Sequence, residues 1–137
     1  MIMGRVMAID YGLKRVGIAV TDPLRIIASP LTTVNTPELL DFLETYMKTE
    51  PLDELVVGMP VGLDNRDTDA TQLVRTAMGK ISGKFPGLKL VTVDERFTSK
   101  IATASIREGG AKKKQRRDKK LIDKVSASLI LQTYLGI

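Results

Sequence analysis

The fold is decided near the N-terminus, in the stretch Val6-Met7-Ala8-Ile9-Asp10-Tyr11-Gly12-Leu13-Lys14-Arg15-Val16-Gly17-Ile18-Ala19-Val20. Its two apolar runs predict strands over residues 5–10 and 16–20, joined by a short turn. An apolar strand of this kind is typical of a sheet centre, where an ionised carboxylate is costly unless something compensates it. Asp10, which ends the first strand, is therefore either half-solvated at the edge of the sheet or the anchor of a metal site. We favour the metal site.

The pattern beyond this hairpin predicts an α/β fold. A third strand is expected over about 25–34, with apolar positions at Ile26, Ile27 and Leu31. Alternating elements follow: a helix after Thr36, a strand over 55–58, a helix over about 67–81, a strand over 88–93, and helices over about 98–109 and 118–135. The order β-β-β-α-β-α-β-α-α suggests a mixed sheet whose later strands are parallel.

The composition restricts the chemistry that the chain can perform. Its 137 residues suit one domain over residues 1–137. Cysteine and histidine are both absent, which excludes disulfides, thiolate or imidazole metal sites and histidine-based catalysis. An enzyme of this composition depends on carboxylates, which favour hard cations such as Mg²⁺ or Mn²⁺. Without a signal-peptide pattern or an apolar run long enough to span a bilayer, we expect a cytoplasmic protein.

Acidic residues far apart in the sequence are candidates for one metal site. Asp94 and Glu95 follow the last predicted strand, where they could simply cap the next turn, and strand alternation lets only one of them face a given site. Asp123 lies on the core-facing stripe of the final helix, unless it is a first-turn acid favoured by the helix dipole. Sites of open α/β sheets lie beyond the carboxyl ends of parallel strands, so these acids are expected to converge with Asp10. Two divalent ions ~4 Å apart would neutralise them and suit phosphodiester hydrolysis.

The positive charge of the chain is concentrated in one segment. Residues 112–120 carry seven basic side chains and one acidic one, a net charge of +6, whereas the whole chain carries +5. Such a run favours a polyanionic partner over a solvated loop, and the absence of aromatic residues favours phosphate contacts over base stacking. Lys14 and Arg15 of the first turn either flank the same crevice or are ordinary exposed turn residues. The candidate nucleic-acid contacts in the basic segment are Lys112, Lys113, Lys114, Arg116 and Arg117.

Four motifs, in this order along nearly the whole chain, resemble those of a known family. They are IDYGLKRVGIAVTD at 9–22, VVGMP at 56–60, VDERFT at 93–98 and IDKVSA at 122–127. They resemble the RuvX (or YqgF) family of Holliday-junction-resolvase-like proteins in the ribonuclease H-like superfamily. The resemblance implies an RNase H-like mixed five-stranded sheet of order 3-2-1-4-5. It also implies a metal-dependent nuclease that processes pre-16S rRNA in ribosome biogenesis, with resolution of Holliday junctions as an older interpretation.

Carried over by position, the acidic residues of the family fall on Asp10, Glu95 and Asp123, which would hold Mg²⁺ or Mn²⁺, two ions in all. In the implied strand order the last strand lies two spacings, or ~9.6 Å, from the first. The longer side chain of Glu95 is therefore favoured over Asp94, which is kept as the alternative.

The sequence is also compatible with other functions. A non-catalytic ribosome assembly factor would keep the basic segment but would bind no cation near Asp10. A fragment of an actin-like or sugar-kinase ATPase would also begin with Asp10-Tyr11-Gly12, although such enzymes need two domains. Both structured RNA and branched DNA fit a phosphate-binding segment. A resolvase favours a homodimer with paired sites, whereas an RNA-processing nuclease can act as a monomer.

Overall fold

A five-stranded mixed sheet forms the centre of the molecule in a computed structural model that describes residues 4–59, 69–94 and 119–137. Its strands lie in the order β3-β2-β1-β4-β5, which confirms the order that the family resemblance implied. The first three are joined as antiparallel neighbours, and β4 and β5 run parallel to β1. The strands are β1 (Arg5–Tyr11), β2 (Arg15–Thr21), β3 (Ala28–Asn35), β4 (Leu52–Met59) and β5 (Lys89–Asp94).

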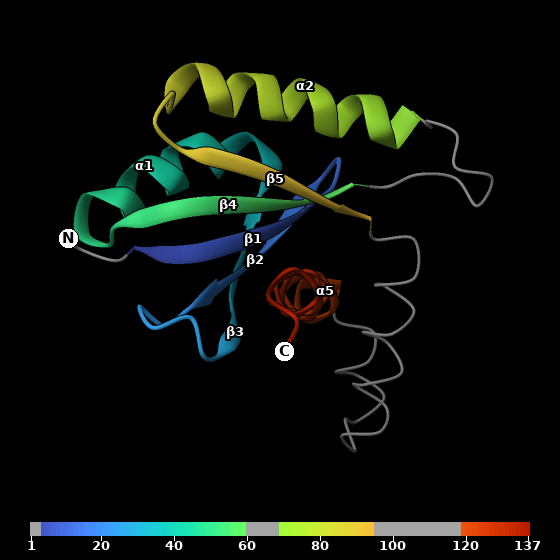
Figure 1. Cartoon of the computed structure of the whole chain (residues 1–137). Coiled ribbons are helices and arrows are strands. Elements are labelled where there is room, and N and C mark those ends of the chain that lie inside the picture. The colour runs from blue at the N-terminus through green and yellow to red at the C-terminus, as the bar shows by residue number, and fades with distance from the viewer. Residues whose placement is uncertain (1–3, 60–68, 95–118) are drawn as a thin grey trace.

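Helices cover both faces of the sheet. Figure 1 shows α1 (Leu39–Thr49) and α2 (Asp69–Lys84) on one face and α5 (Lys119–Leu135) on the other. A 3-10 turn, η1 (Thr36–Glu38), leads into α1, with Pro37 at the position where a helix tolerates a missing N–H. Within the described ranges, none of these helices is long and apolar enough to cross a membrane.

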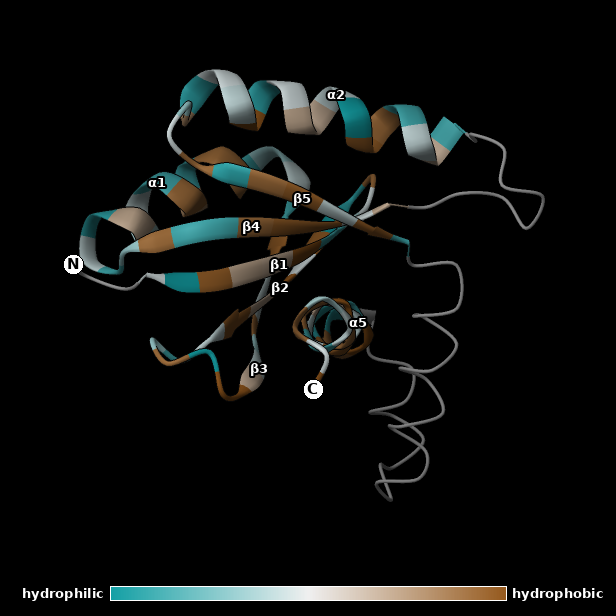
Figure 2. Cartoon of the chain, viewed as in Figure 1, coloured by the Kyte–Doolittle hydropathy of each residue, from teal (hydrophilic) through white to brown (hydrophobic). Residues whose placement is uncertain are grey.

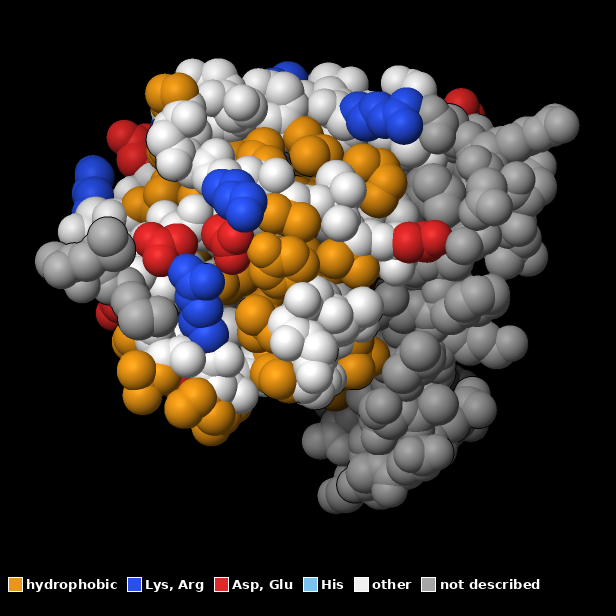
Figure 3. Space-filling model, in the orientation of Figure 1, with side chains coloured by type: hydrophobic (Ala, Val, Ile, Leu, Met, Phe, Trp, Pro, Cys, Tyr) orange, Lys and Arg blue, Asp and Glu red, His pale blue; other side chains and the backbone are white. Residues whose placement is uncertain are grey.

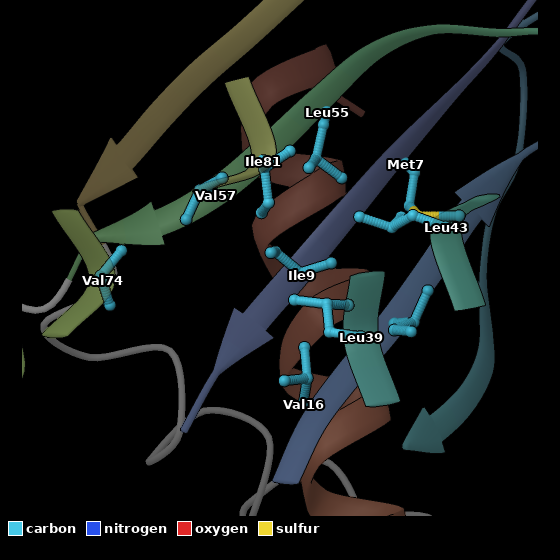
Figure 4. Close-up of a cluster of buried hydrophobic side chains, with 10 residues drawn as sticks. Met7, Ile9, Val16, Leu39, Leu43, Leu55, Val57, Val74 and Ile81 are labelled. Carbon is cyan, nitrogen blue, oxygen red and sulfur yellow. The ribbon is translucent and has the colours of Figure 1, made fainter. Parts of the chain in front are cut away.

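The alternation of side chains along β1 divides the core into two layers. Met7 and Ile9 face α1 and α2, whereas Val6 and Ala8 face α5, and all four are almost completely buried. Hydrophobic stretches accordingly follow the central strands in Figure 2. The first layer is drawn in Figure 4, where the side chains from the strands meet those of the two helices, namely Met7, Ile9, Val16, Leu55 and Val57 against Leu39, Leu43, Val74 and Ile81.

Helix α5 packs against the sheet through the apolar stripe that the sequence indicated. Ala127, Ile130 and Leu131 are fully buried against the sheet, and Tyr134 adjoins them. This stripe is the one on which Asp123 was predicted to lie, at its N-terminal end. The helix therefore brings an acidic residue from near the C-terminus to the face of the sheet that carries Ala8.

The third strand begins later than its apolar pattern suggested. β3 starts at Ala28, because the carboxylate of Asp22 accepts hydrogen bonds from the backbone N–H groups of Ile26 and Ile27 and holds a turn there. Arg25 in this turn has a φ of 60°, a left-handed conformation that ends strand pairing. Ile26, Ile27 and Leu31 are exposed and are not core positions. The helix predicted over about 98–109 lies outside the described residues.

Candidate active site

Asp10 lies at the end of β1 on the face of the sheet that α5 covers. It follows Val6 and Ala8 in the alternation of β1, and both of these residues belong to the layer beneath α5. Its register partner in β2 is Gly17. Directly opposite residues of an antiparallel pair lie ~5 Å apart and project to the same side. The half-buried side chain of Asp10 therefore projects from the face of the sheet that α5 covers, beside Gly17.

The backbone of α5 comes very close to the sheet at Gly17. A Cβ atom built on this residue would overlap the backbone carbonyl of Asp123 and would lie 2.8 Å from the backbone nitrogen of Lys124. Only glycine leaves room for the helix backbone at this distance. Because Asp10 is the register partner of Gly17, the close approach brings Asp123 beside the end of β1. Two of the three predicted acids are thus placed on the same face of the sheet, on either side of Gly17's contact with α5, although 113 positions separate them in the sequence.

An ion pair joins Asp123 to the first turn. The Nε–H of Arg15 donates a hydrogen bond of 2.9 Å to Oδ2 of Asp123, and both side chains are about one quarter exposed. Arg15 begins β2, two residues before Gly17, so it projects to the same face of the sheet. It is therefore also a diagonal neighbour of Asp10, at a typical separation of ~7–8 Å. Among the described residues, the site consequently contains two carboxylates, Asp10 and Asp123, and one arginine.

The turn that carries Arg15 is held by backbone hydrogen bonds. The N–H of Gly12 donates to the carbonyl of Arg15 over 2.9 Å, and the N–H of Thr36 donates to the carbonyl of Lys14 over 3.0 Å. The hydroxyl of Thr36 also donates to the carbonyl of Gly12 over 2.7 Å. These contacts fix the backbone from which Arg15 extends. The side chain of Lys14 is exposed, so it is available to a partner in solution.

Asp94 does not belong to this group of acids. It is the register partner of Met59, which packs against the layer beneath α1 and α2, whereas the preceding residue, Val93, packs against the layer beneath α5. Asp94 therefore projects to the face opposite Asp10. Glu95, the favoured third ligand, lies outside the described residues, so its position stays a prediction.

The residues that are present suit a hard divalent cation. Asp10 and Asp123 offer carboxylate oxygens on one face, the donor type that Mg²⁺ and Mn²⁺ prefer. Within residues 4–59, 69–94 and 119–137, no three acidic side chains form a ligand cluster. The predicted third acid lies outside these ranges. The two described carboxylates therefore suit the predicted metal site, whose third ligand, Glu95, stays a prediction.

Basic side chains border the first turns of α5. A hollow of about 210 Å³ opens between β3 and this helix, and Lys120 and Lys124 are among the residues that line it. The hydroxyl of Thr33 donates to the carbonyl of Lys120 over 2.7 Å and ties the helix to β3. The basic residues Lys112, Lys113, Lys114, Arg116 and Arg117 lie outside the described residues. On the face drawn in Figure 3, the described acidic and basic side chains are interspersed, without one large basic patch.

Sequence reasoning missed two features of this site. The ion pair between Arg15 and Asp123 spans 108 positions, and nothing in the local pattern of either residue indicates it. The role of Gly17 did leave a signal, because a glycine inside an apolar strand often marks a close approach of another backbone. The pattern could not identify which backbone approaches.

Known proteins match this chain along nearly its whole length. The model of a family described as "RuvX: Holliday junction resolvase" matches residues 4–136. A protein of Amoebophilus asiaticus named "Putative pre-16S rRNA nuclease" is 51% identical over 134 residues, which are 98% of this chain and 95% of that protein. A protein of Christiangramia forsetii with the same name is 50% identical over 133 residues, covering 97% of this chain and 98% of that one.

A solved structure shares the fold at low sequence identity. The structure described as "T. thermophilus RuvC in complex with Holliday junction substrate" aligns with a TM-score of 0.55 and 18% identity, over 97% of this chain and 96% of that one. Together with the strand order, this likeness shows that the chain has the RNase H-like fold.

Proposed function

The chain belongs to the RuvX family, and from that premise we propose that it is a metal-dependent endonuclease that cleaves phosphodiester bonds in pre-16S rRNA. Residues 1–137 would form one nuclease domain. The observation that carries the proposal is the placement of Asp10 and Asp123 on one face of the sheet, where α5 approaches Gly17, the register partner of Asp10. The nuclease character itself follows from the family, whereas metal dependence and the RNA substrate belong to the proposal.

In the proposed reaction, the acidic residues bind metal and the basic residues bind the substrate. Asp10, Asp123 and Glu95 would hold two Mg²⁺ or Mn²⁺ ions. When bound, such ions supply activation of the attacking water and stabilisation of the leaving oxygen. The three carboxylates would offset most of the positive charge of the ions. Arg15 and Lys14, at the end of the β1–β2 turn, contact phosphates of the substrate near the site, and the basic segment binds the backbone further away.

Precursor rRNA is favoured over a DNA junction by the comparisons. The relatives named for pre-16S rRNA are about half identical over nearly the whole length of both chains. The junction-bound RuvC structure is only 18% identical, a level that supports the fold and not the substrate. Resolution of Holliday junctions is therefore kept as the second candidate function, on the strength of the family description.

Cleavage assays on both substrates test the proposal. Purified protein is incubated with a precursor 16S rRNA fragment and with a four-way DNA junction, each with Mg²⁺ and with EDTA. We expect cleavage of the RNA only with Mg²⁺, and no symmetric cuts in the junction. Paired cuts in the junction with intact RNA would instead establish a resolvase. Binding without cleavage of either substrate, in Mg²⁺ and in Mn²⁺, would favour an assembly factor and refute the nuclease proposal.

Neutralising the basic segment is expected to weaken RNA binding in a salt-dependent way. The variant replaces Lys112, Lys113 and Lys114 by Gln. Affinity falls as salt rises, and each lost phosphate contact makes the slope of log affinity against log salt shallower by about 0.7 to 0.9. If all three side chains contact phosphates, the slope becomes shallower by about 2 to 3. Fluorescence anisotropy over a series of salt concentrations measures this slope. An unchanged affinity at low salt would contradict the proposed role of the segment.

A further inference from the structure

Arg15 pairs with a carboxylate that the proposed function assigns to metal binding. Arg15 supplies a positive charge to Asp123 through a 2.9 Å hydrogen bond, and it is a diagonal neighbour of Asp10. Two carboxylates on one half-buried face repel each other unless a cation lies nearby. In the protein without metal, Arg15 partly fills this need. A metal ion that binds Asp123 competes with Arg15 for the same carboxylate.

We propose that Arg15 is a metal-displaced arginine, which pairs with Asp123 in the metal-free protein and moves to a substrate phosphate when divalent ions bind. The proposal rests on the metal-dependent function proposed above. A guanidinium suits both partners, because its fork of N–H groups matches carboxylate and phosphate oxygens alike. Arg15 extends from a turn fixed by Thr36, so its side chain can move while its backbone stays in place.

Such an exchange couples the binding of metal to the binding of nucleic acid. Without metal, Arg15 is held by Asp123 and contributes little to phosphate binding. With metal, it is released and strengthens the contact with the substrate. By thermodynamic linkage, the substrate must then raise the affinity for metal by the same factor. Arg15 thereby makes tight substrate binding depend on a metal-loaded site.

Metal affinity gives the first test, and it requires no catalytic activity. Calorimetric titration with Mg²⁺ compares the natural protein with the Arg15→Gln and Lys14→Gln variants. We expect Arg15→Gln to bind Mg²⁺ about tenfold more tightly, since the competing cation is gone, which corresponds to about 1.4 kcal/mol. Lys14→Gln removes the same charge from the adjacent, exposed position and controls for the general electrostatic effect. It should change the affinity less than about twofold.

Nucleic-acid affinity in two ionic conditions gives the second test. Binding of an RNA oligonucleotide is measured by anisotropy in Ca²⁺ and in EDTA, and a gel verifies that the RNA stays intact. Ca²⁺ also binds carboxylate oxygens. We expect Arg15→Gln to bind RNA as well as the natural protein in EDTA but about tenfold more weakly in Ca²⁺. An Arg15→Lys variant, which keeps a cation, should recover part of this loss, and circular dichroism verifies that each variant is folded.

The possible results separate this inference from the proposed function. Equal Mg²⁺ affinities of the Arg15→Gln and Lys14→Gln variants, or an equal loss of RNA binding with and without metal, would overturn the displacement of Arg15 alone. A loss of thermal stability in Arg15→Gln without a change in Mg²⁺ affinity would do the same and would assign Arg15 a structural role. Absence of Mg²⁺ binding by the natural protein would overturn both proposals.

Discussion

Replacing Asp10 by Asn is expected to reduce RNA cleavage at least a thousandfold. The substitution keeps the size of the side chain but removes the charge that would hold a divalent ion beside β1. A thousandfold loss corresponds to about 4 kcal/mol of transition-state stabilisation, within the range that a bound metal supplies. Single-turnover cleavage of a precursor 16S rRNA fragment, with protein in excess, measures the effect without interference from product release.

The same variant should stay folded and should keep its affinity for RNA in EDTA. Asp10 is half-buried at the end of its strand, and asparagine fits the same space. Asp41→Asn provides a matched control, because Asp41 is exposed on α1, on the opposite face of the sheet, and its replacement should leave cleavage unchanged. If Asp10→Asn cleaved RNA at the natural rate, Asp10 could not be a ligand of the catalytic metal.

Much of the fold follows from local patterns that the packing reinforces. The apolar strand before Asp10 is completely buried, as its composition predicts, and the stripe of Ala127, Ile130 and Leu131 faces the sheet. The strand order came from the family resemblance, which the family match supports. The start of β3 was missed, because the side chain of Asp22 and the left-handed Arg25 form a turn that hydrophobicity alone does not reveal.

The sequence predicted which acidic residues form the candidate site, but it did not predict the ion pair within it. The positions of Asp10 and Asp123 at the ends of core elements indicated that they converge. The approach of α5 to Gly17, the register partner of Asp10, brings them to one face of the sheet. Strand alternation placed only one of Asp94 and Glu95 at the site, and the structure turns Asp94 away. The pairing of Arg15 with Asp123 depends on how closely a helix approaches a strand, a tertiary quantity that no local pattern encodes.

Gly17→Ala directly tests the close approach of α5 to the sheet, and it is expected to impair both stability and catalysis. The new methyl group would overlap the backbone carbonyl of Asp123, and a backbone cannot rotate away as a flexible side chain can. The helix must shift, and overpacking of this kind costs about 1–3 kcal/mol of unfolding free energy. The shift also moves Asp123 relative to Asp10. A displacement of about 1 Å at a catalytic site can cost about a hundredfold in rate.

The matched control for this substitution is Gly79→Ala. Gly79 is exposed in the interior of α2, where an added Cβ meets no atom within 4 Å. Alanine there should stabilise the helix by about 0.5–1 kcal/mol and leave cleavage unchanged. Urea denaturation and single-turnover cleavage compare the two variants with the natural protein. A Gly17→Ala variant as stable and as active as Gly79→Ala would contradict this prediction. It would show that the contact between Gly17 and α5 is not what holds Asp123 near Asp10.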